Sequence, residues 1–74
     1  MALLGLGELK WRMLRRVLRK KRFRFEEARN MSRNDKQHFQ WLLENGFFED
    51  LGNGWYRITE KGRAAAELGQ YEVP

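Results

Sequence analysis

Four side chains on one predicted helix, residues 32–45, have the chemistry to recognise the edges of nucleic-acid bases. At about 100° per residue, Arg33, Asn34, Gln37 and Gln40 fall opposite the apolar residues of this helix. A guanidinium group pairs with guanine O6 and N7, and a carboxamide pairs with adenine N6 and N7. A polar helix face is more often a solvated surface, so this pattern alone leaves both interpretations open.

No combination of residues indicates catalysis or metal binding. The chain has no Cys and one His, His38, so the spacing of a metal site is absent. Glu26 and Glu27 are adjacent in a predicted helix, and Glu49 and Asp50 are adjacent in a predicted strand. Adjacent side chains point in different directions in both kinds of element, so neither pair is an acid–base couple. We therefore expect no enzyme activity, no cofactor and no metal.

The positive charge is concentrated in the first half of the chain. Residues 1–37 contain twelve Lys and Arg against four Asp and Glu, whereas residues 38–74 contain three against six. Such asymmetry indicates a polyanionic partner, although a charged helix face can also serve solubility alone. The longest apolar stretch, residues 2–6, is far shorter than the roughly 18 residues of a membrane span, and no signal peptide is recognisable. Together with the lack of Cys, this fits a cytoplasmic protein without a membrane partner.

The first half of the chain predicts a basic amphipathic helix followed by short elements. Residues 8–21 place Leu14, Val17 and Leu18 on one side and arginines on the other, and we assign the apolar side to the core. Residues 22–25 alternate basic and aromatic side chains, which suits a brief strand with Phe23 and Phe25 on one face. Residues 26–30 suit a short helix.

The second half predicts a long helix, a hairpin and a last helix. Ser32 and Asp35 resemble a capping box for residues 32–45, with Asp35 at the exposed first turn, and Gly46 suits the position after the helix end. Two strands, residues 47–50 and 55–59, flank a tip at residues 51–54 whose glycines allow positive φ. Thr59 is a predicted N-cap for residues 60–69, a helix that Gly62 weakens by about 1 kcal/mol relative to alanine.

The order of these elements predicts one α+β domain at residues 8–69. Residues 1–7 are expected to be a loosely attached N-terminal segment, and residues 70–74 a frayed C-terminus. This domain resembles the winged helix-turn-helix domains of bacterial transcription regulators, such as the MarR-like and PadR-like families. Three segments carry the resemblance: Ser32-Arg33 before the long helix, residues 42–49 (LLENGFFE) at its end, and residues 56–62 (YRITEKG) in the second strand and last helix.

The resemblance implies three helices, a β-hairpin wing and a short C-terminal helix, with the third helix in the major groove of double-stranded DNA. Ser32 and Lys36 would contact phosphates, and Arg57 would act from the wing. The candidate DNA-binding residues are therefore Ser32, Arg33, Asn34, Lys36, Gln37, Gln40 and Arg57. A role in transcription regulation, or as an accessory factor, follows from the same resemblance.

Some features suit other partners. The predicted wing tip, residues 51–54, has no Lys or Arg, whereas the first helix and residues 22–25 are rich in them. RNA binding through the first helix is therefore one alternative. Trp41, expected to pack under the wing near Trp55, suggests a second alternative, in which both residues and the wing bind a protein partner. Whether the chain acts as a monomer or a weak homodimer stays open.

Overall fold

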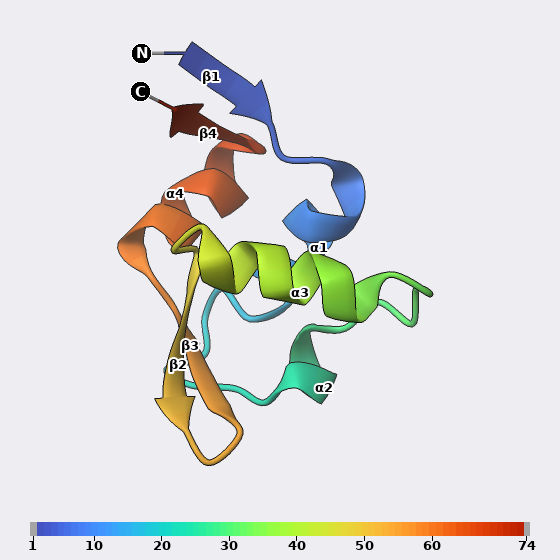
Figure 1. The fold of residues 1–74 in the computed structure, drawn as a ribbon. Coiled ribbons are helices and arrows are strands. Elements are labelled where there is room, and N and C mark those ends of the chain that lie inside the picture. Colours follow the sequence, from blue (N-terminus) through green and yellow to red (C-terminus); the bar gives the residue numbers. More distant parts are fainter. Residues whose placement is uncertain (1, 74) are drawn as a thin grey trace.

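Four helices and two antiparallel two-stranded sheets make up residues 2–73, the part of the chain that the computed structural model describes (Figure 1). The α+β class expected from the sequence is confirmed, in a molecule of 35 × 24 × 20 Å. The elements in chain order are β1 (Ala2–Gly5), α1 (Glu8–Arg16), α2 (Phe25–Ala28), α3 (Asp35–Glu44), β2 (Phe48–Gly52), β3 (Trp55–Ile58), α4 (Glu60–Leu68) and β4 (Gln70–Val73).

The first helix is shorter than predicted. It ends at Arg16 instead of Lys21, and the N–H groups of Val17 and Leu18 bond to carbonyls only three residues back. Four cations, residues 19–22, follow directly. A continued helix would place Arg19 and Lys20 four residues from Arg15 and Arg16, and like charges at this spacing are destabilising. The basic run therefore lies in the connection to α2.

The predicted strand at residues 22–25 is reduced to a single bridge. Phe23 and Tyr56 exchange two backbone hydrogen bonds of 2.8 Å, which hold this segment beside β3. Phe25 does not continue the strand, because it begins α2. The Glu27 carboxylate accepts a hydrogen bond from the Arg24 N–H at 2.7 Å, which fixes the change from extended chain to helix.

The third helix begins at Asp35, three residues later than predicted, and ends at Glu44. Residues 32–34 form a tight turn in which the Asp35 N–H bonds to the Ser32 carbonyl at 3.3 Å. The half of the capping box supplied by Asp35 is present, because its carboxylate accepts from the Ser32 N–H at 2.9 Å. However, Asp35 is only 2% exposed, so its predicted place at an exposed turn was wrong. Its hydrogen bond and a nearby arginine compensate for that burial.

The predicted hairpin is confirmed. In β2 and β3, Phe48 pairs with Ile58 and Glu49 with Arg57, and the register shifts beside the tip. Gly52, Asn53 and Gly54 all have positive φ there, as a tight hairpin turn requires. Figure 1 shows this hairpin projecting from the end of the molecule opposite to the chain termini.

The last helix begins where Thr59 predicted it. The Thr59 hydroxyl accepts a hydrogen bond from the Gly62 N–H at 3.1 Å. A Cβ at Gly62 would lie 2.3 Å from the carbonyl oxygen of Phe47, so only glycine lets α4 approach the end of α3 this closely. This packing requirement explains a glycine that lowers the intrinsic stability of the helix.

The two ends of the chain form a sheet, contrary to expectation. β1 and β4 pair antiparallel, with Ala2 opposite Val73 and Gly5 opposite Gln70, so residues 2–5 are not loosely attached and residues 70–73 are not frayed. Tyr71 packs against Phe47 with ring centroids 5.5 Å apart. Backbone pairing and this aromatic contact order both ends. Residues 1 and 74 lie outside the described residues.

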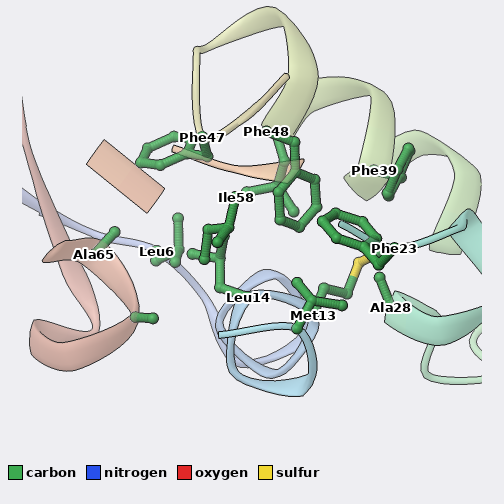
Figure 2. Packing of buried hydrophobic residues seen from close by; sticks show 13 residues of the cluster. Leu6, Met13, Leu14, Phe23, Ala28, Phe39, Phe47, Phe48, Ile58 and Ala65 are labelled. Atoms are coloured by element: carbon green, nitrogen blue, oxygen red, sulfur yellow. The ribbon is translucent and has the colours of Figure 1, made fainter. Parts of the chain in front are cut away.

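A single apolar core joins the helices to both sheets (Figure 2). Phe23, Phe39 and Phe48 gather on one side of it, with ring centroids 4.9–6.3 Å apart, and Leu6 and Ala65 lie on the other side. Such aromatic contacts stabilise beyond their area of burial. The core therefore fixes one face of α3 and leaves the other face exposed.

None of the helices within residues 2–73 has the length and apolar character needed to cross a membrane.

Candidate nucleic-acid interface

The amino end of α3 presents four of the predicted site residues together. Arg33 and Asn34 lie in the turn before the helix, and Lys36 and Gln37 lie in its first turn. All four are exposed, and their side chains make no hydrogen bond or ion pair with any other residue from 2 to 73. This group, the α3 amino-end group, therefore has its donors and acceptors free for another molecule.

A small set of contacts around the buried Asp35 fixes the turn that carries this group. The Ser32 hydroxyl accepts a hydrogen bond from the Asn34 N–H at 3.2 Å, and the half-buried Ser32 therefore belongs to the same turn. Asp35 Oδ2 lies 3.6 Å from Arg29 Nε, which is an ion pair longer than a good hydrogen bond. Arg29 Nε and Asp35 Oδ1 have no hydrogen-bond partner among the described residues. Asp35 thus ties α2 to the start of α3.

The carboxyl end of α3 has a different character. Gln40, predicted as a site residue, is exposed but donates a hydrogen bond to the Glu44 carboxylate at 3.0 Å. Both residues line an open groove of about 640 Å³ between α3 and the hairpin, together with Glu49 and Asp50. Two of its three carboxylates, those of Glu44 and Asp50, have no cationic partner among the described residues and repel a polyanion, whereas Glu49 is paired with Arg57. Gln40 is therefore not brought into one basic surface with the α3 amino-end group.

Arg57 is exposed on β3, but it is not a free cation. It forms an ion pair with Glu49, the residue opposite it on β2. Such a cross-strand pair stabilises the hairpin modestly. The positive charge that the sequence placed on the wing is therefore offset within the hairpin.

The structure places two other arginines beside the hairpin, which the site prediction left out. The guanidinium carbons of Arg22 and Arg24 lie 4.3 and 4.4 Å from the centroid of the Trp55 ring. These three residues form what we name the Arg–Trp cluster. The alternation of residues 22–25 carried the signal, because a buried Phe23 directs its neighbours to the opposite face. The contact of these arginines with Trp55 depends on the bridge to β3. No local sequence pattern predicts that bridge.

Arg24 also brings positive charge to the tip of the hairpin. A Cβ built on Gly54 would lie 3.2 Å from Arg24 Nη1. The tip contains no Lys or Arg of its own. A residue thirty positions away in the sequence therefore supplies the cation that the hairpin tip lacks.

Trp41 does not lie where the sequence analysis placed it. Its ring stacks on Phe47 at 5.4 Å and meets Tyr71 at 5.5 Å, with Lys10 Nζ 4.9 Å from the ring centroid. Trp55 instead contacts the two arginines of the Arg–Trp cluster. Trp41 therefore joins α3 to the ends of the chain, and the packing of Trp41 near Trp55 was a wrong prediction.

Several cations of α1 have partners within the molecule. Arg12 forms an ion pair with Glu8 at 2.6 Å, and Arg16 donates to the Asn30 amide oxygen at 2.9 Å. Arg15 lies over the ring of Trp11, 5.3 Å from its centroid. These exposed pairs are individually weak. They nevertheless occupy hydrogen-bond donors of Arg12 and Arg16, two of the residues that the RNA-binding alternative would use.

Two ionisable groups near the interface have displaced pKa values. Burial lowers the pKa of the half-buried His38 below 6.5, the Lys10 charge lowers it further, and Asp35 opposes both effects. The pKa of Glu27 is also lowered, mainly by its hydrogen bond from Lys20 and then by the bond from the Arg24 N–H. Neutral His38 and ionised Glu27 are therefore the forms that this fold favours.

The α3 amino-end group and the Arg–Trp cluster are two exposed groups whose cationic side chains have no acidic partner among the described residues. A function for them must be inferred from their chemistry and their positions, since comparisons of the chain with family models, curated proteins and solved structures found no match.

Proposed function

We propose that this chain is a small winged helix-turn-helix protein that binds double-stranded DNA, with α3 in the major groove. The observation that carries the proposal is the α3 amino-end group: Arg33, Asn34, Lys36 and Gln37 are exposed and unpartnered within residues 2–73, while the opposite side of α3 is buried. A role in transcription regulation, as a regulator or an accessory factor, belongs to the same proposal.

The chemistry of this group suits base recognition. Arg33 offers a donor fork for guanine O6 and N7, and Asn34 and Gln37 offer amides for adenine N6 and N7. Lys36 and the helix amino end attract phosphate. A B-form major groove admits an α-helix, whereas the deep, narrow groove of duplex RNA does not. The group therefore suits DNA better than duplex RNA.

The position of the hairpin supports its assignment as a wing. It follows α3 after one turn, at Gly46, and projects from the body of the molecule (Figure 1). Its acidic groove faces the carboxyl end of α3, so the proposed contact uses the amino end of the helix. Gln40 and Arg57 become peripheral in this arrangement, because each already has an acidic partner.

Fluorescence anisotropy with a labelled random-sequence duplex tests binding, and selection from a random duplex library identifies the preferred site. We expect Arg33→Ala to weaken binding at that site by about 1–3 kcal/mol and to relax the preference at one base pair. Arg63→Ala is the matched control: Arg63 is also exposed, and lies on α4 beside Glu60. That control should lose far less affinity.

Two results would contradict the proposal. One is the absence of duplex binding at low salt, where phosphate contacts are strongest. The other is equal behaviour of Arg33→Ala and Arg63→Ala at the selected site. Competition between duplex RNA and duplex DNA at matched salt separates the RNA-binding alternative, which predicts that RNA wins and that the α1 arginines matter most.

The protein-binding alternative has a separate signature. A chemical-shift titration with duplex DNA should move the resonances of the α3 amino-end group if the proposal holds. If Trp41, Trp55 and the hairpin form a protein surface instead, DNA leaves the spectrum unchanged. The structure gives these two tryptophans different neighbours. A single apolar contact with a protein partner is therefore not expected to shift the resonances of both.

A further inference from the structure

We infer that the Arg–Trp cluster is a second binding site for the same duplex, and that Arg22 and Arg24 bind the phosphate backbone beside the hairpin tip. This inference rests on the proposed function and deepens it, because it names the residues that supply the wing contact. Neither arginine was among the residues that the sequence suggested for DNA binding.

The backbone around the cluster is held on two sides. Phe23 is joined to Tyr56 by two hydrogen bonds, and the Arg24 N–H bonds to the Glu27 carboxylate. Phe23 is fully buried, so the residues on either side of it in the extended segment face outward. Trp55 precedes Tyr56 on β3. The fold therefore brings Arg22, Arg24 and Trp55 to one outer surface.

Unlike four of the other eight arginines, those of the cluster have no acidic partner among the described residues. Arg12, Arg29, Arg57 and Arg63 all form ion pairs. Arg22 and Arg24 are exposed and form none with the residues from 2 to 73, although Glu27 binds the Arg24 backbone. Their charge is therefore free to attract a polyanion.

The aromatic contact orients these charges. A guanidinium group stacked on a ring keeps its N–H donors at its edge, where they can bind a phosphate bidentately. Because stacking already orders the side chain, less conformational entropy is lost on binding. Two oriented forks beside a hairpin tip suit two phosphates of a backbone better than a single small anion.

The position of Arg24 connects the cluster to the wing. Its Nη1 atom reaches the tip glycine Gly54. The tip has positive φ at three successive residues and carries no side chain longer than that of Asn53 from residue 52 to residue 54. A backbone can therefore approach this end of the hairpin closely, and Arg24 is the cation that it meets.

The test compares two double variants that each remove two positive charges. In Arg22→Ala/Arg24→Ala, the slope of log K against log salt should fall by about 2, if each guanidinium contacts one phosphate. In Arg12→Ala/Arg63→Ala, which removes arginines with acidic partners elsewhere, the slope should stay near that of the wild type. Equal slopes in the two double variants would overturn the inference.

A second measurement needs no variant to stay folded. In a titration of the wild-type protein with the selected duplex, the side-chain Nε–H resonances of Arg22 and Arg24 and the indole N–H of Trp55 should shift. If they stay fixed while the α3 amino-end group shifts, the inference is overturned and the proposed function stands. Parallel titration with duplex RNA should shift them less, and stronger RNA binding at the cluster would also overturn the inference.

The same experiments also detect the opposite case, in which the cluster binds DNA but α3 does not. If loss of Arg22 and Arg24 lowers the salt slope while Arg33→Ala behaves like its control, the cluster binds DNA and α3 does not read it. If the wild-type protein binds no duplex DNA at low salt, both proposals are overturned together.

Discussion

The two ends of α3 differ in what they offer to a polyanion. At the amino end, Arg33 and Lys36 are exposed without acidic partners among the described residues. At the carboxyl end, Glu44 lines a groove with Glu49 and Asp50, and Gln40 already donates to Glu44. The same helix therefore attracts negative charge at one end and repels it at the other.

This difference bears on how a duplex would lie on the molecule. A helix inserted along its whole length would bring phosphates toward the acidic groove, at an electrostatic cost. Contact at the amino end avoids that cost, and the helix dipole adds attraction there. The Arg–Trp cluster then supplies a second positive region without any contribution from the groove. The orientation of a bound duplex would thus depend on the positions of the acidic side chains as much as on those of the basic side chains.

The largest effect is expected from removing the contact that holds both ends of α3 in place. Phe39 is 5% exposed, and its ring lies 4.8–6.3 Å from those of Phe23, Phe25, Phe48 and Tyr56. Phe39→Ala should lower the free energy of unfolding by about 3–5 kcal/mol, because a cavity replaces the ring. Urea unfolding followed by circular dichroism measures this change.

The matched control for Phe39→Ala is Phe39→Leu, which keeps most of the volume and should cost much less. Loss of 5 kcal/mol is comparable with the whole stability of many small domains, on the order of 5–15 kcal/mol. The alanine variant is therefore expected to be largely unfolded. A cost below that of the leucine variant would contradict the packing described for α3.

A smaller effect is expected at the amino end alone. Asp35→Ala removes the acceptor of the Ser32 N–H and the partner of Arg29, so it should cost about 1–3 kcal/mol of unfolding free energy. It should also weaken DNA binding, because the turn that carries Arg33 loses its anchor. Asp35→Asn keeps the size and one acceptor oxygen and should lose less. Unchanged stability in the alanine variant would show that the buried carboxylate of Asp35 does not stabilise this turn.

The carboxyl end provides the opposite test. Glu44→Gln with Asp50→Asn should strengthen duplex binding by up to about 1 kcal/mol at low salt, because repulsion between exposed charges is weak in water. Anisotropy titrations at several salt concentrations measure this gain, which should shrink as salt rises. Glu67→Gln with Glu72→Gln removes the same charge from α4 and β4. An equal gain in both variants would mean that only net charge matters.

Elements with strong local signals were predictable from the sequence. Thr59 and Gly46 mark helix ends by chemistry that acts within a few residues, and both assignments are confirmed. The hairpin tip was equally clear, since Gly52 and Gly54 have the positive φ that such turns need. The apolar face of α3 followed from spacing alone, and Phe39 and Leu42 are indeed buried.

Features that depend on distant parts of the chain were missed. β1 and β4 have little strand signal by themselves, and they form only because the fold brings the chain ends together. The burial of Asp35 depends on Arg29, and the Arg–Trp cluster depends on the bridge between Phe23 and Tyr56. Of the candidate site, the α3 amino-end group could therefore be found from sequence, whereas the acidic groove and the cluster required coordinates.

The smallest expected effect concerns His38, which lies between the two ends of α3. Its pKa is lowered from 6.5, first by burial and then by the Lys10 charge. The unfolded chain therefore takes up this proton at higher pH than the folded protein does. The contribution of neutral His38 to stability is complete above about pH 6.5, falls as the pH drops through the folded pKa, and is then constant.

Urea unfolding of the wild type and of His38→Gln, at several pH values from about 7.5 to about 5, isolates this contribution, since the carboxylates common to both proteins cancel in the difference. The wild type should lose more stability than the variant over that range, and Lys10→Gln should reduce the loss by removing the second cause of the low pKa. Parallel pH profiles for wild type and His38→Gln would mean that the imidazole is as well solvated in the folded protein as in the unfolded chain.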